Sequence, residues 1–196
     1  LNSHSKYDDV LLNMVGRHNA LNSTACFAVS KVLDISFDKY RSSISGFRTV
    51  DRRLQLKYDE NGIKVYDDYA HHPVEISSSL NGLKEMGSGK LITVFQPHLF
   101  SRTRDFYKEF ANELSIADEI ILMDIYPARE LPIEGVTSQM ILNELNSKKA
   151  VLITDKNEII NTLLKSIKTG DIVVFQGAGD VTNLCSEFVQ RLKNND

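Results

Sequence analysis

The 196-residue sequence has no tryptophan, two cysteines and four prolines. Cys26 and Cys185 lie far apart in the chain, which argues against a disulfide framework and favours a reducing compartment. No apolar run approaches the roughly 18 residues that a membrane-spanning helix needs, and the opening residues show no signal-peptide core. These absences predict a cytoplasmic protein that does not engage a membrane.

A strong charge imbalance is also missing. The sequence has 23 Lys and Arg residues against 26 Asp and Glu residues, and no block rich in Lys or Arg, so we expect no nucleic-acid partner. Hydrophobic residues make up 42%, enough for a globular core. The first residue is Leu1 rather than methionine, so we expect a piece of a longer protein.

Short apolar runs separated by amphipathic stretches follow residue 90. Their β-branched and aromatic residues and their continuous apolarity are typical of strands buried on both faces of a parallel sheet. They start 29, 30 and 22 residues apart, the length of strand–helix units. This pattern predicts an α/β fold with a doubly wound, Rossmann-like, mostly parallel sheet. The runs are Leu91–Phe95, Ile120–Met123, Ala150–Ile153 and Ile172–Phe175.

The segment before these runs predicts a hairpin and a further helix. Arg53–Tyr58 and Ile63–Tyr66 flank Asn61-Gly62, a dipeptide typical of a two-residue hairpin turn. Pro73 then opens a helix at a position that tolerates proline.

Residues 1–47 predict a short helical remnant of another domain. His18–Leu33 and Ser36–Ser45 have helical patterns, and we expect Gly46 to close the second helix as the first residue beyond it. The domain boundary then falls near residue 47, which leaves 48–196 as the α/β domain.

Histidine, arginine and aspartate residues that could bind a ligand follow the predicted strands. The carboxyl ends of parallel strands meet at one edge of an open sheet, where ligands bind. Three of the five histidines, His71, His72 and His98, lie in such loops. Because several of these loops share one edge, we expect a binding cleft there.

Each loop has more than one interpretation. Asp67 and Asp68 next to His71 and His72 could hold a divalent metal, as in a phosphoesterase, although adjacent side chains rarely chelate one ion, and we assign no metal ligand. Arg102, four residues after His98, favours recognition of a carboxylate or phosphate, helped by the amides that begin the following helix.

Two further features are ambiguous at this point. Arg104 could join the anion site, or it could pair with Asp105 or Glu109 on the solvent face. Gly177-Ala178-Gly179 either lets a ligand approach the backbone or marks a tight strand–helix turn.

Six short motifs occur in a fixed order along nearly the whole chain. Together they closely resemble the Mur ligase family of peptidoglycan biosynthesis, and in particular its L-alanine-adding branch. The motifs are 16–22 (GRHNALN), 51–53 (DRR), 67–73 (DDYAHHP), 95–98 (FQPH), 102–104 (RTR) and 124–128 (DIYPA).

The resemblance implies a domain organisation and an activity. Residues 1–47 would be the end of the central ATPase domain, and 48–196 the C-terminal domain, which admits the amino acid and closes over ATP. The complete protein would be an ATP-dependent carbon–nitrogen ligase that joins L-alanine to UDP-N-acetylmuramate through an acyl phosphate. This chain has no phosphate-binding P-loop, so by itself we expect it to be inactive.

The resemblance also implies roles for individual residues. Magnesium would be held mostly by the central domain and the phosphates. Arg52 would be a second candidate for the phosphates. The residues expected to bind ATP are His18, Asn19, Asn22, Arg53, Asp68 and Tyr69, and those expected to bind L-alanine are His71, His98 and Arg102.

Two positions depart from the family pattern. Ala70 stands where glycine is usual, and Leu99 where a basic residue is common, which places more of the amino-acid selectivity on Arg102. Two alternatives stay open: a murein-tripeptide recycling ligase of the same family, and a stand-alone nucleotide- or amino-acid-binding module without catalysis.

Overall fold

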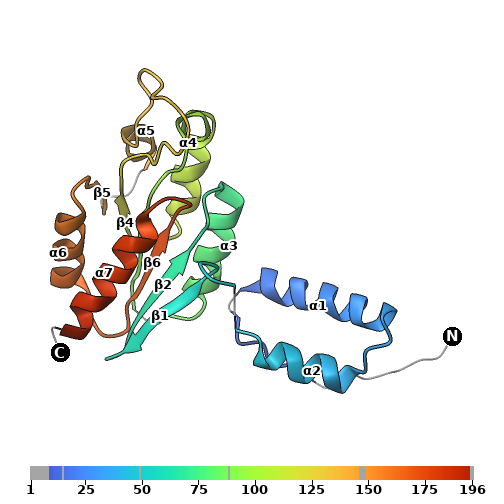
Figure 1. Ribbon diagram of the computed structural model, residues 1–196. Helices are drawn as coiled ribbons and strands as arrows, with labels where there is room; N and C mark the ends of the chain where they lie inside the picture. The colour runs from blue at the N-terminus through green and yellow to red at the C-terminus, as the bar shows by residue number, and fades with distance from the viewer. Residues whose placement is uncertain (1–8, 15, 49, 88, 146–148, 195–196) are drawn as a thin grey trace. The chain divides into compact units, whose positions relative to one another are not determined.

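The computed structural model describes residues 9–14, 16–48, 50–87, 89–145 and 149–194. Its contacts divide the chain into two compact units, Leu1–Val50 and Asp51–Asp196, both visible in Figure 1. The sequence-based division lies three residues earlier, and residues 1–8 and 15 of its first segment lie outside the described part. The identity of the first unit as the end of an ATPase domain stays a prediction.

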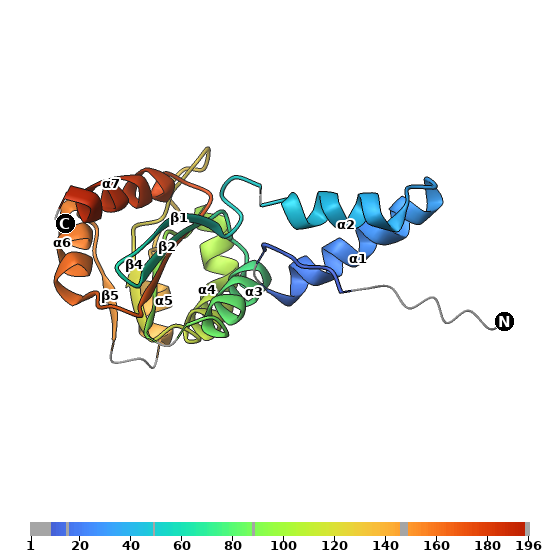
Figure 2. The same cartoon turned by 90° about the horizontal axis from the view of Figure 1, so that it is seen from below.

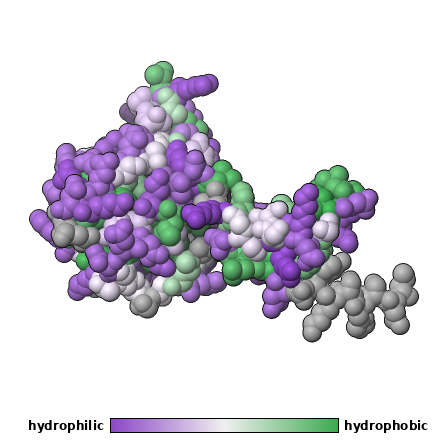
Figure 3. Space-filling view, turned by 60° about the horizontal axis from the view of Figure 1, so that its bottom comes forward, coloured by the Kyte–Doolittle hydropathy of each residue, from purple (hydrophilic) through white to green (hydrophobic). Residues whose placement is uncertain are grey.

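The first unit is a pair of helices, α1 (Arg17–Val32) and α2 (Phe37–Gly46). The hydroxyls of Ser23 and Tyr40 lie 2.6 Å apart between the two helices. Large apolar residues of α1 point outward, among them Val32, which is 82% exposed, and Figure 3 shows hydrophobic residues at the surface of the helix pair.

The predicted role of Gly46 was wrong. It is the last residue of α2 rather than the first beyond it. The helix ends because Phe47 turns to an extended conformation, with φ −74° and ψ 128°.

The predicted hairpin is confirmed, with β1 (Gln55–Glu60) antiparallel to β2 (Ile63–Asp68). Asn61 and Gly62 have φ values of 53° and 73°, as a turn with two left-handed central residues requires. The first strand begins two residues later than predicted because Leu54 also has a positive φ, of 46°, which is incompatible with a strand.

The six strands form one mixed sheet in the order β1-β2-β6-β3-β4-β5. All pairings except β1 with β2 are parallel, so the predicted doubly wound α/β fold is confirmed. The last strand in the chain lies between β2 and β3, and this insertion brings the loops after three strands together. The remaining strands are β3 (Leu91–Phe95), β4 (Glu119–Leu122), β5 (Ala150–Leu152) and β6 (Ile172–Gln176).

Helices cover both faces of the sheet, as Figure 2 shows. The crossovers after β2, β3 and β4 run in one direction along the sheet and place α3, α4 and α5 on one face, whereas the chain returns through α6 and places α6 and α7 on the other. Pro73 is the first residue of its helix, as predicted. The bounds are α3 (Pro73–Lys84), α4 (Phe100–Leu114), α5 (Gln139–Glu144), α6 (Lys156–Ser166) and α7 (Val181–Asn194).

The apolar core explains why the predicted strands form. Every residue of β3 and β6 is buried, since both strands lie inside the sheet with helices on either face. Phe175 of β6 packs against Phe188 of α7, with ring centroids 5.7 Å apart. Among the described residues, no helix combines the length and apolar character that a membrane crossing requires.

Candidate functional site at the carboxyl edge of the sheet

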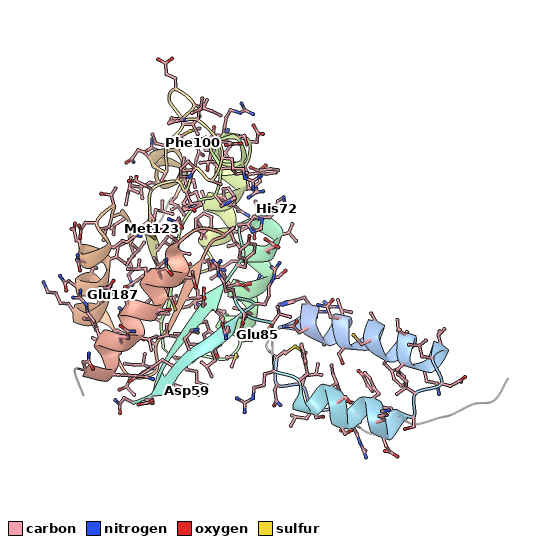
Figure 4. The ribbon with its side chains drawn as sticks, viewed as in Figure 1. Asp59, His72, Glu85, Phe100, Met123 and Glu187 are labelled. Carbon is pink, nitrogen blue, oxygen red and sulfur yellow. The ribbon has the colours of Figure 1, made fainter. Side chains whose placement is uncertain are left out.

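The candidate site lies where β2, β3, β4 and β6 end. In Figure 4, His72, Phe100 and Met123 mark the ends of three of these strands, and Asp59 in the hairpin marks the opposite edge. Parallel pairing brings the residues after each strand into neighbouring positions. The site is therefore built from loops that the sequence separates widely.

His71 is held in one orientation by the loop after β2. Its ring Nδ1 lies 2.8 Å from the carbonyl oxygen of Tyr69, which can only accept, so Nδ1 carries a proton and donates to it. Its backbone N–H donates to Glu75, at 3.1 Å. Burial opposes ionisation of Glu75, but hydrogen bonds from His71 and Arg53 lower its pKa overall. These contacts fix the orientation of the His71 ring at the sheet edge.

His98 belongs to the loop after β3, with β6 between that strand and β2 in the sheet, and lies close to His71, with ring centroids 5.8 Å apart. Its ring stacks on Tyr126, at 5.8 Å and an interplanar angle of 16°. Arg102 Nη1 lies 3.3 Å from His98 Nδ1 and donates to it, which leaves the proton on Nε2. Burial, the Arg102 charge and His71 together lower the pKa of His98, so its ring is neutral at pH 7. The structure thus brings together all three residues predicted for L-alanine.

Arg53 and Tyr69 lie together beside this group. The guanidinium of Arg53 pairs with Glu75 at 3.1 Å and lies 5.6 Å from the Tyr69 ring centroid. Arg52 lies over the same ring at 4.7 Å, but its guanidinium also donates to the carbonyls of Gly177 and Gly179, at 2.7 and 3.2 Å. Arg53 is the more exposed of the two cations, whereas Arg52 ties the start of the domain to the loop after β6.

Asp67 and Asp68 are both buried inside the domain. Asp68 is 2% exposed, accepts the backbone N–H of Leu54 at 3.3 Å and the side-chain amide of Gln176 at 3.2 Å, and has its pKa raised, chiefly by burial. Asp67 accepts from Thr182 at 2.6 Å. The predicted contact of Asp68 with ATP stays a prediction, and the structure shows this carboxylate bonded within its own domain.

The arrangement does not bring Asp67, Asp68, His71 and His72 together as a metal centre. The His72 ring packs edge-on against Phe106 of α4, at 5.1 Å, whereas both carboxylates point into the domain. Within the described ranges, no three His, Cys, Asp or Glu side chains form a group able to hold a metal ion.

The glycines after β6 fit tightly against the loop after β3. A Cβ on Gly177, where φ is 150°, would lie 2.8 Å from the Gln96 carbonyl oxygen. A Cβ on Gly179 would lie 2.5 Å from Tyr126 Cγ and would also overlap Gln96 Oε1. These close approaches support the tight-turn interpretation, and the approach of a ligand to this backbone stays a prediction. The other ambiguous residue, Arg104, pairs with Asp105 at 2.7 Å, as one interpretation predicted.

His18, Asn19 and Asn22 lie in the first turns of α1, in the first unit. The His18 ring lies against Gly16, where a Cβ would come within 2.8 Å of it. The expected role of these three residues toward ATP stays a prediction.

Sequence reasoning missed two residues that shape this edge. Tyr126 was recognised only as part of a motif, yet its ring supports His98. Glu130 received no role, yet its carboxylate accepts the backbone N–H of Ser101 at 2.9 Å and lies against the Ser101 hydroxyl. No local sequence pattern indicates either contact, because each contact joins loops about 30 residues apart in sequence.

Two histidines, two arginines and a tyrosine at the carboxyl edge of a mostly parallel sheet give this domain of the Rossmann-like class a candidate ligand-binding edge. The family described as "Mur ligase, glutamate ligase domain" matches residues 52–179. The chain therefore belongs to the Mur ligase family.

Individual relatives agree with this assignment. A UDP-N-acetylmuramate–L-alanine ligase from Cytophaga hutchinsonii is 40% identical over 190 residues, 96% of this chain and 39% of the relative. The crystal structure of a UDP-N-acetylmuramate–alanine ligase from Thermotoga maritima aligns with a TM-score of 0.82 and 28% identity, over 98% of this chain and 42% of that one. The chain thus spans about two fifths of the length of these relatives.

A third comparison concerns the fold alone. The MurF ligase from Thermotoga maritima, solved in complex with ADP, aligns with a TM-score of 0.72 and 22% identity, over 92% of this chain and 40% of that one.

Proposed function

We propose that this chain is the C-terminal part of an ATP-dependent ligase that joins L-alanine to UDP-N-acetylmuramate in peptidoglycan biosynthesis. The observation that carries the proposal is the 40% identity, over 96% of the chain, to a relative bearing that name. Residues 1–47 are then the end of the central ATPase domain and 48–196 the C-terminal domain. Such an enzyme would work in the cytoplasm.

The geometry at the sheet edge suits an amino-acid substrate. Arg102 offers a guanidinium fork to the α-carboxylate of L-alanine. The neutral ring of His98 presents its Nε2–H as a donor, and the His71 ring lies beside it, which suits recognition of a polar substrate. Such positioning of the amine for attack on an acyl phosphate is how a ligase of this kind gains rate without a covalent bond to the protein.

The neighbouring cations suit a nucleotide. Arg53 would reach the phosphates of ATP, and Tyr69 would lie beside the adenine. Asp68 would act toward the ribose, with His18, Asn19 and Asn22 contributed by the first unit. Magnesium, which the family resemblance implies, would have its ligands mostly on the phosphates and the central domain.

The first test uses the complete protein encoded by the gene. Phosphate release should require ATP, UDP-N-acetylmuramate and L-alanine together, and the 196-residue chain alone should release none. If the complete protein prefers a murein tripeptide to L-alanine, it is the recycling ligase instead. If it shows no ligation while the chain binds ATP at micromolar affinity, the stand-alone binding module is favoured.

A matched pair of arginine variants tests the amino-acid pocket. Arg102→Gln should raise the KM for L-alanine about 10- to 100-fold, because a charge-assisted hydrogen bond to a carboxylate contributes roughly 1.5–3 kcal/mol. Arg104→Gln, two residues along the same helix and paired with Asp105, is the control and should leave this KM unchanged. Equal effects of the two variants would contradict the role given to Arg102.

A further inference from the structure

The N-terminus of α4 already holds a carboxylate from the same domain. Glu130 Oε2 accepts the backbone N–H of Ser101, and Oε1 lies 2.5 Å from the Ser101 hydroxyl oxygen. The first amides of a helix have no partner within the helix and favour negative charge. Hydrogen bonds from the Ser101 side chain and backbone lower the pKa of Glu130, so it is ionised at neutral pH.

A strained turn carries Glu130 to this position. The backbone N–H of Glu130 donates to the carbonyl of Pro127 at 2.9 Å, and Ala128 between them has a φ of 52°, which a residue with a Cβ rarely adopts. This turn reverses the loop after β4, so that the carboxylate faces the start of α4. A conformation that costs free energy persists only where other contacts compensate for it.

A second contact fastens the same two loops a few residues away. The N–H of Leu99 donates to the Tyr126 carbonyl at 2.9 Å, and Leu99 itself has a φ of 74°. The loop after β4 therefore holds the segment between His98 and α4 at two points, through Tyr126 on one side and through Glu130 on the other. Arg102 lies in the helical turn that these contacts fix.

The hydrogen bond from the Ser101 amide to Glu130 changes how a substrate carboxylate can bind. The sequence suggests that the amides at the start of α4 and the side chain of Arg102 recognise one anion together. In the structure, the Ser101 amide already donates a hydrogen bond to the Glu130 carboxylate. With that amide occupied, we expect an incoming carboxylate to bind the Arg102 guanidinium, which also donates to His98 Nδ1 at 3.3 Å.

We propose that Glu130 is a positioning residue of the amino-acid pocket. Its carboxylate occupies the place at the N-terminus of α4 that an external anion would otherwise take, and it thereby fixes the direction of Arg102 toward the substrate carboxylate. This inference rests on the proposed function, because it assumes that Arg102 recognises an amino acid. Glu130 itself does not contact the substrate.

The test compares Glu130→Ala and Glu130→Gln in the complete ligase. Glu130→Ala should raise the KM for L-alanine about tenfold, the effect of weakening one charge-assisted hydrogen bond, and leave kcat and the KM for ATP within about twofold. Glu130→Gln keeps an acceptor for the Ser101 amide and should stay within about threefold of the parent. Glu134→Ala, an exposed carboxylate of the same loop, is the matched control.

Formate provides a readout that a purely structural role would not produce. In Glu130→Ala the α4 amides are free, so added formate should occupy them and return the KM for L-alanine toward the parent value, with no such effect on the parent enzyme. An unchanged KM for L-alanine in Glu130→Ala, or an equal loss for all substrates that formate does not reverse, would overturn the inference. Absence of L-alanine ligation by the parent itself would instead overturn the proposed function.

Discussion

Replacing Gly179 by alanine tests whether the loop after β6 is shaped by packing. The added Cβ would lie 2.5 Å from Tyr126 Cγ and 2.8 Å from Tyr126 Cβ, far inside contact distance, and would overlap Gln96 Oε1. Neither neighbour can move freely. Gln96 Oε1 accepts the N–H of Val181 and its Nε2 donates to Asp180, at 3.1 and 2.7 Å, while the Tyr126 ring stacks on His98.

Because neither neighbour can move freely, Gly179→Ala should lower the free energy of unfolding. Overpacking typically destabilises by about 1–3 kcal/mol, and we expect Gly179→Ala in the upper half of that range because backbone or bonded atoms must shift. About 2–3 kcal/mol corresponds to amide exchange faster by roughly 30- to 150-fold wherever exchange needs opening of the whole unit. Mass-spectrometric hydrogen exchange on the buried amides of β6 measures this directly.

Gly46→Ala provides the control within the same chain. Gly46 has no atom within 4 Å of its would-be Cβ and lies at the end of α2, in the other unit. This variant should leave the exchange of β6 unchanged. Exchange in Gly179→Ala within threefold of the parent would show that the loop relaxes easily and would refute the packing argument.

Two further predictions concern titration and reactivity. The His98 ring should titrate below pH 6.5 by NMR, and Arg102→Gln should raise its pKa while Arg104→Gln should not, because Arg102 is one of the charges that lower it. The His98 ring takes up a proton at a higher pH in the unfolded chain than in the folded domain, so it should lower the free energy of unfolding as pH falls through 6.5. A His98 ring that titrates above pH 6.5 would contradict the structure. Burial raises the pKa of Cys185 to about 12. A thiol reagent at pH 8 should therefore label the exposed Cys26 and leave Cys185 unmodified until the protein unfolds. Equal labelling of both cysteines would count against the described core.

Local sequence patterns determined the elements of this fold. Continuous apolar runs such as Ile172–Phe175 can be satisfied only in a sheet covered on both faces, and Asn61-Gly62 favours a two-residue hairpin. Proline at the first position of a helix acts through its own fixed φ, so α3 was predictable from Pro73. The ordered motifs also indicated the family, and with it a candidate site at the sheet edge.

Tertiary structure decided what those elements bring together. No local pattern reveals that β6 lies between β2 and β3, because strand order depends on the packing of the whole sheet. The same applies to the burial of Asp68, to the proximity of His71 and His98, and to the carboxylate of Glu130 at the start of α4. Each depends on contacts between residues distant in sequence, so periodicity and spacing place these residues in loops, whereas only the folded sheet sets their partners and charge states.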